Sequence, residues 1–198
     1  IGIPIKNVLF ESFEPGPKII NGDINGDIFL VKFNSSGVFQ WVYTAGASAA
    51  DDARALALDS NDNPYITGSF SGTVDFGGGN ITAANTDDLF ILKLNSSGAY
   101  QNIYTSNIFT TQKGKGLAVD SSGNIYATGT FSGTVDFGGG NITTSGNDIY
   151  LLKLNSCVIT DHLKASCILL VLRITHKNMI SKTNKVCGQN LVIVNVNF

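Results

Sequence analysis

Apolar and polar residues alternate in short runs along most of the chain, and polar turns separate the runs. Residues 54–59 (RALALD) alternate, and residues 64–70 (PYITGSF) form a second β-rich run after the turn SNDN. Residues 116–120 (GLAVD) and 125–131 (IYATGTF) repeat this arrangement around the turn SSGN. Asn, Asp, Ser and Gly between two such runs are typical of hairpins. We therefore predict two pairs of antiparallel strands.

A third type of run is apolar at nearly every position. It reads DLFILKLN at residues 88–95, and the turn SSG then leads into the aromatic-rich run 99–105 (AYQNIYT), which matches 38–44 (VFQWVYT). A continuously apolar strand is expected where both faces of a sheet are covered. The pattern predicts units of four short strands, each covered on both faces by its neighbours.

These units form an internal repeat. The runs DIFLVKFNSSG, DLFILKLNSSG and DIYLLKLNSCV begin at Asp27, Asp88 and Asp148, at spacings of 61 and 60 residues. Residues 59–82 and 120–143 are identical at 19 of 24 positions, and the stretch FSGTVDFGGGNIT occurs in both copies without change. Repeats of this kind are typical of stacked architectures, in which each unit buries its faces against its neighbours.

These motifs resemble a known family. The apolar run ending in K-[FL]-N-S-S-G, the aromatic strand and the motif A-[LV]-D-S-x-x-N-x-Y-x-T-G-[ST]-F are similar to the bacterial, seven-bladed-type β-propeller repeats called SBBP repeats. FSGTVDFGGG resembles their long hairpin variant in secreted bacterial proteins, and the resemblance covers roughly residues 13–156. It implies an all-β fold, an incomplete β-propeller array of four-stranded antiparallel blades, and a secreted or cell-surface bacterial protein.

The repeat divides the chain into an array and a tail. We expect a remnant of a preceding blade at 1–26, the repeats over 27–156, and an atypical C-terminal tail at 157–198. The array consists of a half blade, a full blade and a truncated blade, at 27–46, 54–107 and 115–156. This makes about two and a quarter repeats, whereas closed propellers have about 4–8 blades. Closure would therefore need further blades, in cis or in an oligomer.

The tail differs from the array in charge and residue usage. Residues 1–156 contain 8 Lys and Arg against 14 Asp and Glu, whereas residues 157–198 contain 5 against 1. All cysteines, both histidines and the single methionine lie in the tail, at Cys157, Cys167, Cys187, His162, His176 and Met179. Their spacing matches no zinc motif, and an odd number of cysteines does not suit a disulfide framework.

Two interpretations of the tail stay open. In the first, the β-like runs 167–175 and 190–198 pair with the open edge of the third blade and cap it. In the second, the repeat frame is lost near Ser156 and the tail is an out-of-frame or read-through peptide. The abrupt change in composition favours the second interpretation slightly.

Bulk composition narrows the range of partners. The formal net charge is −2 and 14% of the residues are charged, so neither nucleic acid nor an anionic membrane is an expected partner. No apolar run reaches the roughly 18–20 residues of a membrane-spanning helix. The chain begins at Ile1 without a signal peptide, which leads us to expect a fragment or a processed product.

The glycine triplets at 77–79 and 138–140 are the first candidates for chemistry. A phosphate-binding loop would place its glycines at the start of a helix, usually followed by Lys and Ser or Thr. Here the strand-like run NIT follows, with no basic residue. We therefore predict hairpin turns in which glycine supplies positive φ angles.

Two Asp-rich segments have the alternating oxygen ligands of a calcium loop. The first contains Asp23, Asn25 and Asp27, and the second contains Asp59 and Asp62. No Glu follows at the spacing of an EF-hand, and the next repeat has Gly in place of Asp62. We therefore predict turns closed by side-chain hydrogen bonds and no metal site.

Other charged residues recur with the repeat. The apolar run carries one lysine in every copy, at Lys32, Lys93 and Lys153. Recurrence favours a structural role, with the stem packed between blades and the ammonium at the rim, paired with an Asp. The adjacent acids at 51–52 and 87–88 imitate a carboxylate dyad. We expect them in turns with their side chains on opposite faces, which is unsuitable for acid–base catalysis.

The fourth strand is rich in aromatic residues, namely Trp41, Tyr43, Tyr100 and Tyr104. Packing against the next blade is their expected role, and stacking on a sugar or a protein partner is the alternative. Four glycosylation sequons are interpreted as turn sequences that the repeat has multiplied, at Asn34, Asn80, Asn95 and Asn141.

The sequence therefore predicts a non-catalytic structural or binding module without catalytic, cofactor-binding or metal-binding residues. Its ligand, an unknown protein or carbohydrate, would bind through the loops between strands. The alternatives are a fragment of a propeller-based extracellular hydrolase or lyase, and a calcium-dependent adhesin. Catalysis would need polar residues unique to one blade, and the near-identity of the copies speaks against it.

Overall fold

The computed structural model describes residues 27–106, 110–137 and 141–155 in full, together with the backbone of four further strands. Every regular element described is a β-strand, so the predicted all-β fold class is confirmed. Among these residues, no helix has the length and apolar character needed to cross a membrane.

The strands are short, and most of the turns between them are polar. In chain order they are β1 (Val8–Leu9), β2 (Ile19–Ile20), β3 (Ile28–Phe33), β4 (Phe39–Ala45), β5 (Asp52–Leu58), β6 (Pro64–Phe70), β7 (Thr73–Asp75), β8 (Asn80–Thr82), β9 (Asp88–Leu94), β10 (Tyr100–Thr105), β11 (Gln112–Val119), β12 (Ile125–Phe131), β13 (Thr134–Val135), β14 (Ile142–Thr143), β15 (Asp148–Leu154), β16 (Ile168–Ile174) and β17 (Met179–Lys182).

The middle sheet contains four antiparallel strands in the order β10-β9-β6-β5. It confirms the predicted four-stranded unit, because the alternating runs form β5 and β6, the continuously apolar run forms β9, and the aromatic run forms β10. Between β6 and β9 the chain makes a separate hairpin, β7-β8. This hairpin lies within the stretch FSGTVDFGGGNIT, as predicted.

The first sheet consists of β3 and β4, which correspond to β9 and β10. The last sheet has the order β11-β12-β15-β16-β17, and β13-β14 repeats the small hairpin. The truncated third unit supplies β11, β12 and β15, and the backbone of β16, from the tail, pairs antiparallel with the open edge of β15. The edge pairing considered for 167–175 is thus present, whereas the run 190–198 lies outside the described residues. The out-of-frame origin of the tail stays a prediction.

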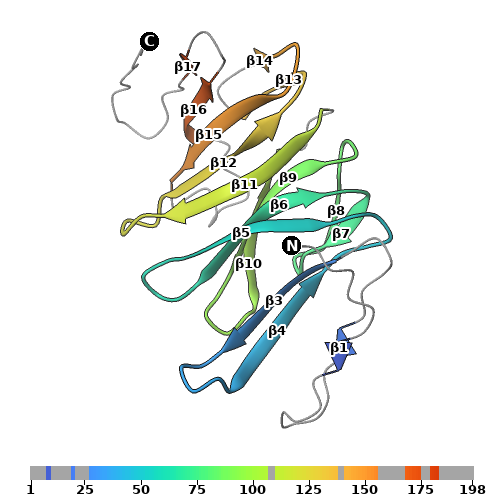
Figure 1. Cartoon of the computed structure of the whole chain (residues 1–198), viewed down its shortest axis with the longest axis vertical. Helices are drawn as coiled ribbons and strands as arrows, with labels where there is room; N and C mark the ends of the chain where they lie inside the picture. The colour runs from blue at the N-terminus through green and yellow to red at the C-terminus, as the bar shows by residue number, and fades with distance from the viewer. Residues whose placement is uncertain are drawn as a thin grey trace.

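The three sheets follow one another along the long axis of the molecule, with β11 lying against β5, β6 and β9 (Figure 1). Burial along the central strands reflects this stacking. In the middle sheet β6 is buried at all seven positions, whereas in the last sheet β12 alternates between buried and half-buried positions. The middle sheet is therefore covered on both faces, and the last sheet on one.

Each sheet has two different faces, which we name by their position along the chain. The leading face contacts the preceding sheet, and in the middle sheet it includes Ile66, Phe90 and Leu92, which pack with Ile28 of β3. The trailing face contacts the following sheet, and in the middle sheet it consists mainly of Tyr65, Leu89 and Ile91.

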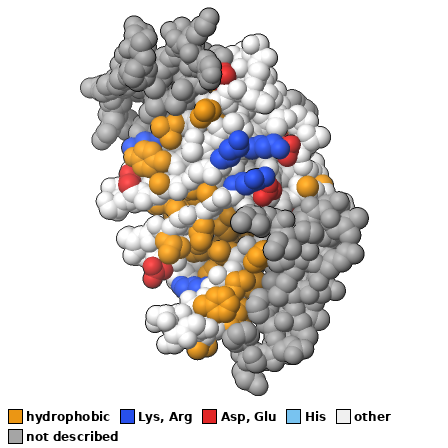
Figure 2. Space-filling model, in the orientation of Figure 1, with side chains coloured by type: hydrophobic (Ala, Val, Ile, Leu, Met, Phe, Trp, Pro, Cys, Tyr) orange, Lys and Arg blue, Asp and Glu red, His pale blue; other side chains and the backbone are white. Residues whose placement is uncertain are grey.

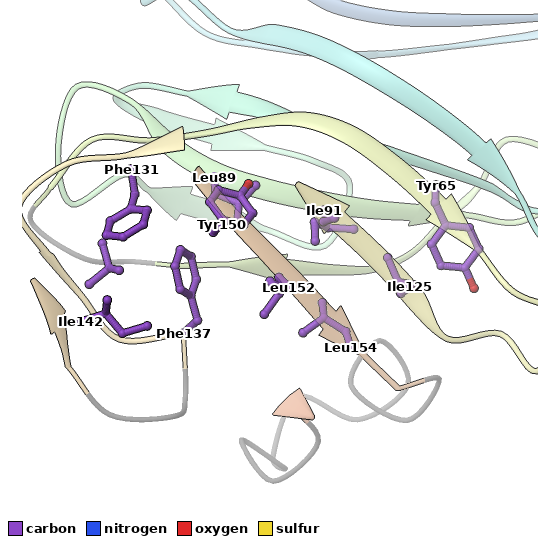
Figure 3. Close-up of a cluster of buried hydrophobic side chains, with 12 residues drawn as sticks. Tyr65, Leu89, Ile91, Ile125, Phe131, Phe137, Ile142, Tyr150, Leu152 and Leu154 are labelled. Carbon is purple, nitrogen blue, oxygen red and sulfur yellow. The ribbon is translucent and has the colours of Figure 1, made fainter. Parts of the chain in front are cut away.

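The second interface repeats the first. The trailing face of the middle sheet meets the leading face of the last sheet, where Ala127, Tyr150 and Leu152 replace Ile66, Phe90 and Leu92 (Figure 3). Both interfaces therefore join unlike faces in the same orientation.

The small hairpins extend each interface with aromatic side chains. Phe70 and Phe76 lie at the two ends of FSGTVDF, and both are fully buried beside Phe90, with ring centroids 5.3 Å (Phe70–Phe76) and 5.2 Å (Phe76–Phe90) apart. The next copy repeats the trio with Phe131, Phe137 and Tyr150. The hairpin thus contributes to the hydrophobic core as well as reversing the chain.

The distance between the middle and last sheets depends on a glycine. Gly114 of β11 lies beside a β-bulge and faces β6 directly. A Cβ atom at this position would lie 3.0 Å from the amide nitrogen of Gly68 and 3.0 Å from a methyl group of Leu89, and it would overlap the hydroxyl oxygen of Thr67. A side chain at residue 114 would therefore force the two sheets apart.

We expect Gly114→Ala to lower the free energy of unfolding by about 1–3 kcal/mol, the usual cost of inserting a methyl group into a packed interface. Urea denaturation followed by circular dichroism measures this change. The matched control is Gly146→Ala, where no atom lies within 4 Å of the added methyl group and φ is not positive. The control should change stability by no more than about 0.5 kcal/mol. Equal effects of the two variants would contradict close contact at Gly114.

Candidate functional site

A groove of about 320 Å³ lies between the first and middle sheets. It is lined by four successive residues of β3, one residue of β4, two of β5, one of the turn between β5 and β6, and the first residue of β6: Leu30, Val31, Lys32, Phe33, Trp41, Leu56, Leu58, Asp62 and Pro64. The space-filling view shows hydrophobic side chains gathered in the lower half of the molecule, where these strands lie (Figure 2). The walls are therefore mainly apolar, with one positive and one negative side chain.

The groove follows the edge of β3. Successive residues of a strand point to opposite faces, so four in a row can line one groove only along an edge. The opposite edge of β3 pairs with β4. In the middle sheet, the corresponding edge of β9 pairs with β6. The groove therefore occupies the place that a second strand fills in the middle sheet.

Trp41 is held in position by the turn that follows β9. Its indole N–H donates to the carbonyl oxygen of Ser96 at 3.1 Å, and the ammonium of Lys32 donates to the same oxygen at 3.1 Å. Gly98 of this turn packs on the indole ring, since a Cβ there would lie 2.7 Å from it. Two donors on one carbonyl and a stacked glycine fix one end of the groove.

The recurring lysines make structural contacts, but among the described residues the predicted pairing with an Asp is seen for Lys93 alone. Lys93 lies with its ammonium 5.1 Å from the centroid of the Tyr65 ring and 4.0 Å from a carboxylate oxygen of Asp59. Lys153 lies 5.0 Å from the ring centroid of Tyr126. Ammonium groups over tyrosine rings are stabilised by the ring quadrupole. Only Lys32, which reaches across to Ser96, departs from this arrangement.

Asp59 and Asp120 close the turns between the first two strands of their units, as predicted. One carboxylate oxygen of Asp120 accepts the N–H groups of Ser122 and Asn124, at 2.9 and 2.8 Å. The other oxygen accepts the Asn124 amide at 2.8 Å and the Tyr126 hydroxyl at 3.2 Å. Asp59 makes the same contacts in the middle sheet.

The exchange of Asp62 for Gly123 has a conformational reason. Both residues have positive φ angles, of 59° and 77°. Glycine adopts this region freely, and aspartate is among the few other residues that tolerate it. The backbone conformation of the turn therefore accounts for an aspartate at position 62 and a glycine at position 123. Within the described residues no group of three or more His, Cys, Asp and Glu could hold a metal, while Asp23 and Asn25 lie outside them.

The first acid pair is split between two roles. Asp51 is buried and accepts hydrogen bonds from the N–H groups of Ala47 and Ser71, at 3.0 and 3.1 Å. Asp52 pairs with Arg54 at the surface. The expectation that both acids lie in turns was wrong for Asp52, which begins β5 because this strand extends two residues further back than the alternating pattern indicated.

The second acid pair is split in the same way. Asp87 forms an ion pair with Lys113 of β11 at 3.2 Å. Asp88 begins β9 rather than lying in a turn, is fully buried, and accepts the N–H of Ala84 at 2.7 Å. Burial raises the pKa of Asp88, and the negative charge of Asp87 adds to this, although the N–H groups of Ala84 and Asn85 act in the opposite direction. Within each pair the two acids therefore have different hydrogen-bond or ion-pair partners.

The first glycine triplet forms a hairpin turn, as predicted. Gly77 and Gly79 have φ angles of 103° and 105°, and both donate their N–H groups to one carboxylate oxygen of Asp75, at 2.7 and 3.0 Å. The anion that this turn binds is therefore its own aspartate. Residues 138–140 lie outside the described residues.

The aromatic residues of the fourth strand pack mostly against the neighbouring sheet, as expected. Tyr43 donates its hydroxyl to the carbonyl of Phe76 at 2.8 Å, and burial raises its pKa. Burial also raises the pKa of Tyr104, which packs against the core of the second interface. Tyr100 covers the backbone of the glycine turn 77–79. Trp41 alone of these residues lines the groove.

The sequons at Asn34 and Asn95 serve the turns in which they lie. The side-chain oxygen of Asn34 accepts the N–H groups of Ser36 and Val38, at 3.0 and 2.9 Å. Asn95 accepts those of Ser97 and Ala99 at similar distances. The cysteines and histidines of the tail lie outside the residues whose side chains are described.

Residues 102–130 match the protein family described as SBBP, beta-propeller repeat. The matched segment runs from β10 through β11 and the Asp120 turn to β12, and so spans the joint between two stacked sheets. Over these residues the chain carries a β-propeller repeat of the SBBP type. Its first, middle and last sheets are propeller blades, and the described blades form an array that is not closed.

A second comparison points to the same kind of repeat. An uncharacterized WD repeat-containing protein of Acanthamoeba polyphaga mimivirus is 29% identical over 169 residues, which cover 75% of this chain and 11% of that protein. The chain thus spans about a tenth of the length of this curated relative.

Sequence reasoning missed the groove. No motif marks it. The groove lies along the edge of β3 opposite to β4, and no described strand pairs with that edge. One signal was nevertheless available. Trp41 has Asn102 as its counterpart in the middle blade, so the repeat is broken at a position that lines the groove.

The turn carboxylates predict how stability depends on pH. Hydrogen bonds from Asn124, with smaller ones from Ser122 and Tyr126, hold the pKa of Asp120 below its usual value against the effect of burial. For Asp59 burial raises the pKa, but hydrogen bonds from Asn63 and Asn61 and the charge of Lys93 together outweigh it, so this pKa is lowered too.

A pKa lowered on folding stabilises the protein fully above the unfolded pKa of about 3.9, and this stabilisation is lost as the pH falls through the folded value. We expect Asp120→Asn and Asp59→Asn to cost stability at pH 6 and progressively less below pH 4. Urea unfolding between pH 6 and pH 3 measures the difference from the unmodified chain. Asp62→Asn, in the same turn as Asp59, is the control and should have little effect. A cost that did not change with pH would contradict this role of the carboxylates.

Proposed function

We propose that the chain is a non-catalytic structural and binding module of a secreted or cell-surface bacterial protein. One observation carries the proposal: polar residues that recur in successive blades make the same structural contacts in each. Asp59 and Asp120 close equivalent turns, and Lys93 and Lys153 lie over equivalent tyrosines. A side chain that makes the same structural contact in every blade is not free to act as a catalytic group in one particular blade.

The groove beside β3 is the proposed ligand-binding site. Binding sites for small molecules and peptides are concave and mainly apolar, with a few fixed polar groups. The groove has this character, with Leu56 and Leu58 on one wall and Lys32 and Trp41 on the other. An indole with an apolar surround suits the face of a sugar ring or an aromatic or aliphatic side chain. The proposed ligand is therefore a carbohydrate or an extended segment of a protein.

The proposed location rests on the family resemblance. The glycine-rich hairpin is the feature that resembles secreted bacterial repeats. A surface-labelling experiment on intact cells of the source organism tests this part of the proposal. Antibodies against the blades should bind without permeabilisation, and binding only after permeabilisation would contradict it.

We expect the purified chain to show no turnover of soluble polysaccharides or their oligosaccharides, because most of the described acids accept hydrogen bonds from nearby N–H groups or form ion pairs. Release of reducing ends and of unsaturated products, followed over a day, measures hydrolase and lyase activity. Turnover that persists through purification and disappears after a single substitution of an acid would overturn the non-catalytic assignment.

Trp41 is the single tryptophan of the chain, so tryptophan emission reports on the groove alone. We expect a groove ligand to shift this emission when oligosaccharides and extended peptides are screened by titration. Leu56→Asp should abolish the shift, because it places a charge on the apolar wall. Val38→Asp, at an equally exposed apolar residue outside the groove, should preserve it. Binding detected by calorimetry without a change in emission would show that the ligand site lies elsewhere.

A further inference from the structure

The last blade leaves its trailing face exposed. Ile149 follows Asp148 at the start of β15, as Leu89 follows Asp88 at the start of β9. Leu89 has no exposed surface, because the last blade covers it, whereas 46% of Ile149 is exposed. Among the described residues, no blade covers Ile149 as the last blade covers Leu89.

The first blade leaves its leading face exposed. Phe29 and Phe33 of β3 correspond to Phe90 and Leu94 of β9. Phe90 and Leu94 have no exposed surface, whereas Phe29 is 45% and Phe33 is 46% exposed. The array therefore ends in two apolar faces, one leading and one trailing.

These two faces match each other, since every internal interface joins a trailing face to a leading face. At the joint between the middle and last blades, Leu89 and Ile91 pack against Tyr150, Leu152 and Leu154 (Figure 3). The exposed faces carry the counterparts of both sides of that joint. We propose that the chain associates head to tail, with the trailing face of the last blade of one copy packed on the leading face of the first blade of a second copy.

The chemistry of the two ends favours a second copy as the occupant. A contact between unlike faces is heterologous, and it leaves one face of each kind free in a dimer, so that further copies add until a ring closes. Propellers close with about 4–8 blades, so rings of a few copies would suffice. The net charge of −2 puts little electrostatic repulsion in the way of self-association.

Two variants test the proposal, because each blocks a different face. Ile149→Asp places a charge on the trailing face, and Phe29→Asp places one on the leading face. Both residues are nearly half exposed within one copy, so the fold should survive, and circular dichroism checks this. Sedimentation equilibrium from about 1 to 100 μM should show concentration-dependent assembly of the unmodified chain and a monomer for each variant alone. Val38→Asp, in the turn between β3 and β4, is the control and should assemble like the unmodified chain.

Mixing the two variants gives the decisive result. The intact leading face of Ile149→Asp can bind the intact trailing face of Phe29→Asp, so an equimolar mixture should form heterodimers and nothing larger. An unmodified chain that stays monomeric at 100 μM, or a mixture that stays monomeric, would overturn the proposal. Assembly of both single variants would also overturn it, since strand edges rather than faces would then be responsible. These results concern mass alone, whereas ligand binding in the groove and the absence of turnover are tested separately, by tryptophan emission and by product release.

Discussion

The fold depends on the burial of one sheet face against the next. A sheet that is apolar on both faces cannot be stable in water by itself, and the middle blade satisfies both faces only because a neighbour lies on each side. Its central strand β6 has no exposed position. Other features of the chain bear on this contact. Gly114 limits the distance between the middle and last sheets, and the small hairpins enlarge the buried interfaces. In the described chain, the first and last blades each have a neighbouring blade on only one face.

Polar side chains stabilise the turns between strands by accepting hydrogen bonds from backbone N–H groups that would otherwise lack partners. Each hairpin end exposes N–H groups that need partners, and the side chains of Asp59, Asp120, Asn34 and Asn95 accept them within the turn itself. These backbone N–H groups therefore need no hydrogen-bond acceptors from neighbouring blades. In contrast, Trp41 and Lys32 reach from one blade to the next, and they do so beside the groove.

Much of this architecture could be predicted from the sequence, and the part that could not has a physical reason. Strand order, the hairpin at the glycine triplet and the turns at Asp59 and Asp120 follow from local patterns that report local hydrogen bonding. The start of β5 at Asp52 and the role of Phe76 in the core depend on contacts between blades, which local patterns do not record. The groove was missed for the same reason, because it follows the edge of β3 that pairs with no described strand and is not marked by a motif.

The unchanged stretch FSGTVDFGGGNIT has a consequence for how such arrays grow. Phe70, Val74 and Phe76 are fully buried in the leading interface of their blade, and the strand that follows carries the trailing residues Leu89 and Ile91. A DNA segment of one repeat length therefore encodes both a leading face and a trailing face. The leading face of one such unit can pack on the trailing face of another copy of the same unit. Recombination that inserts or deletes whole segments changes the number of blades without requiring a compensating substitution at any joint.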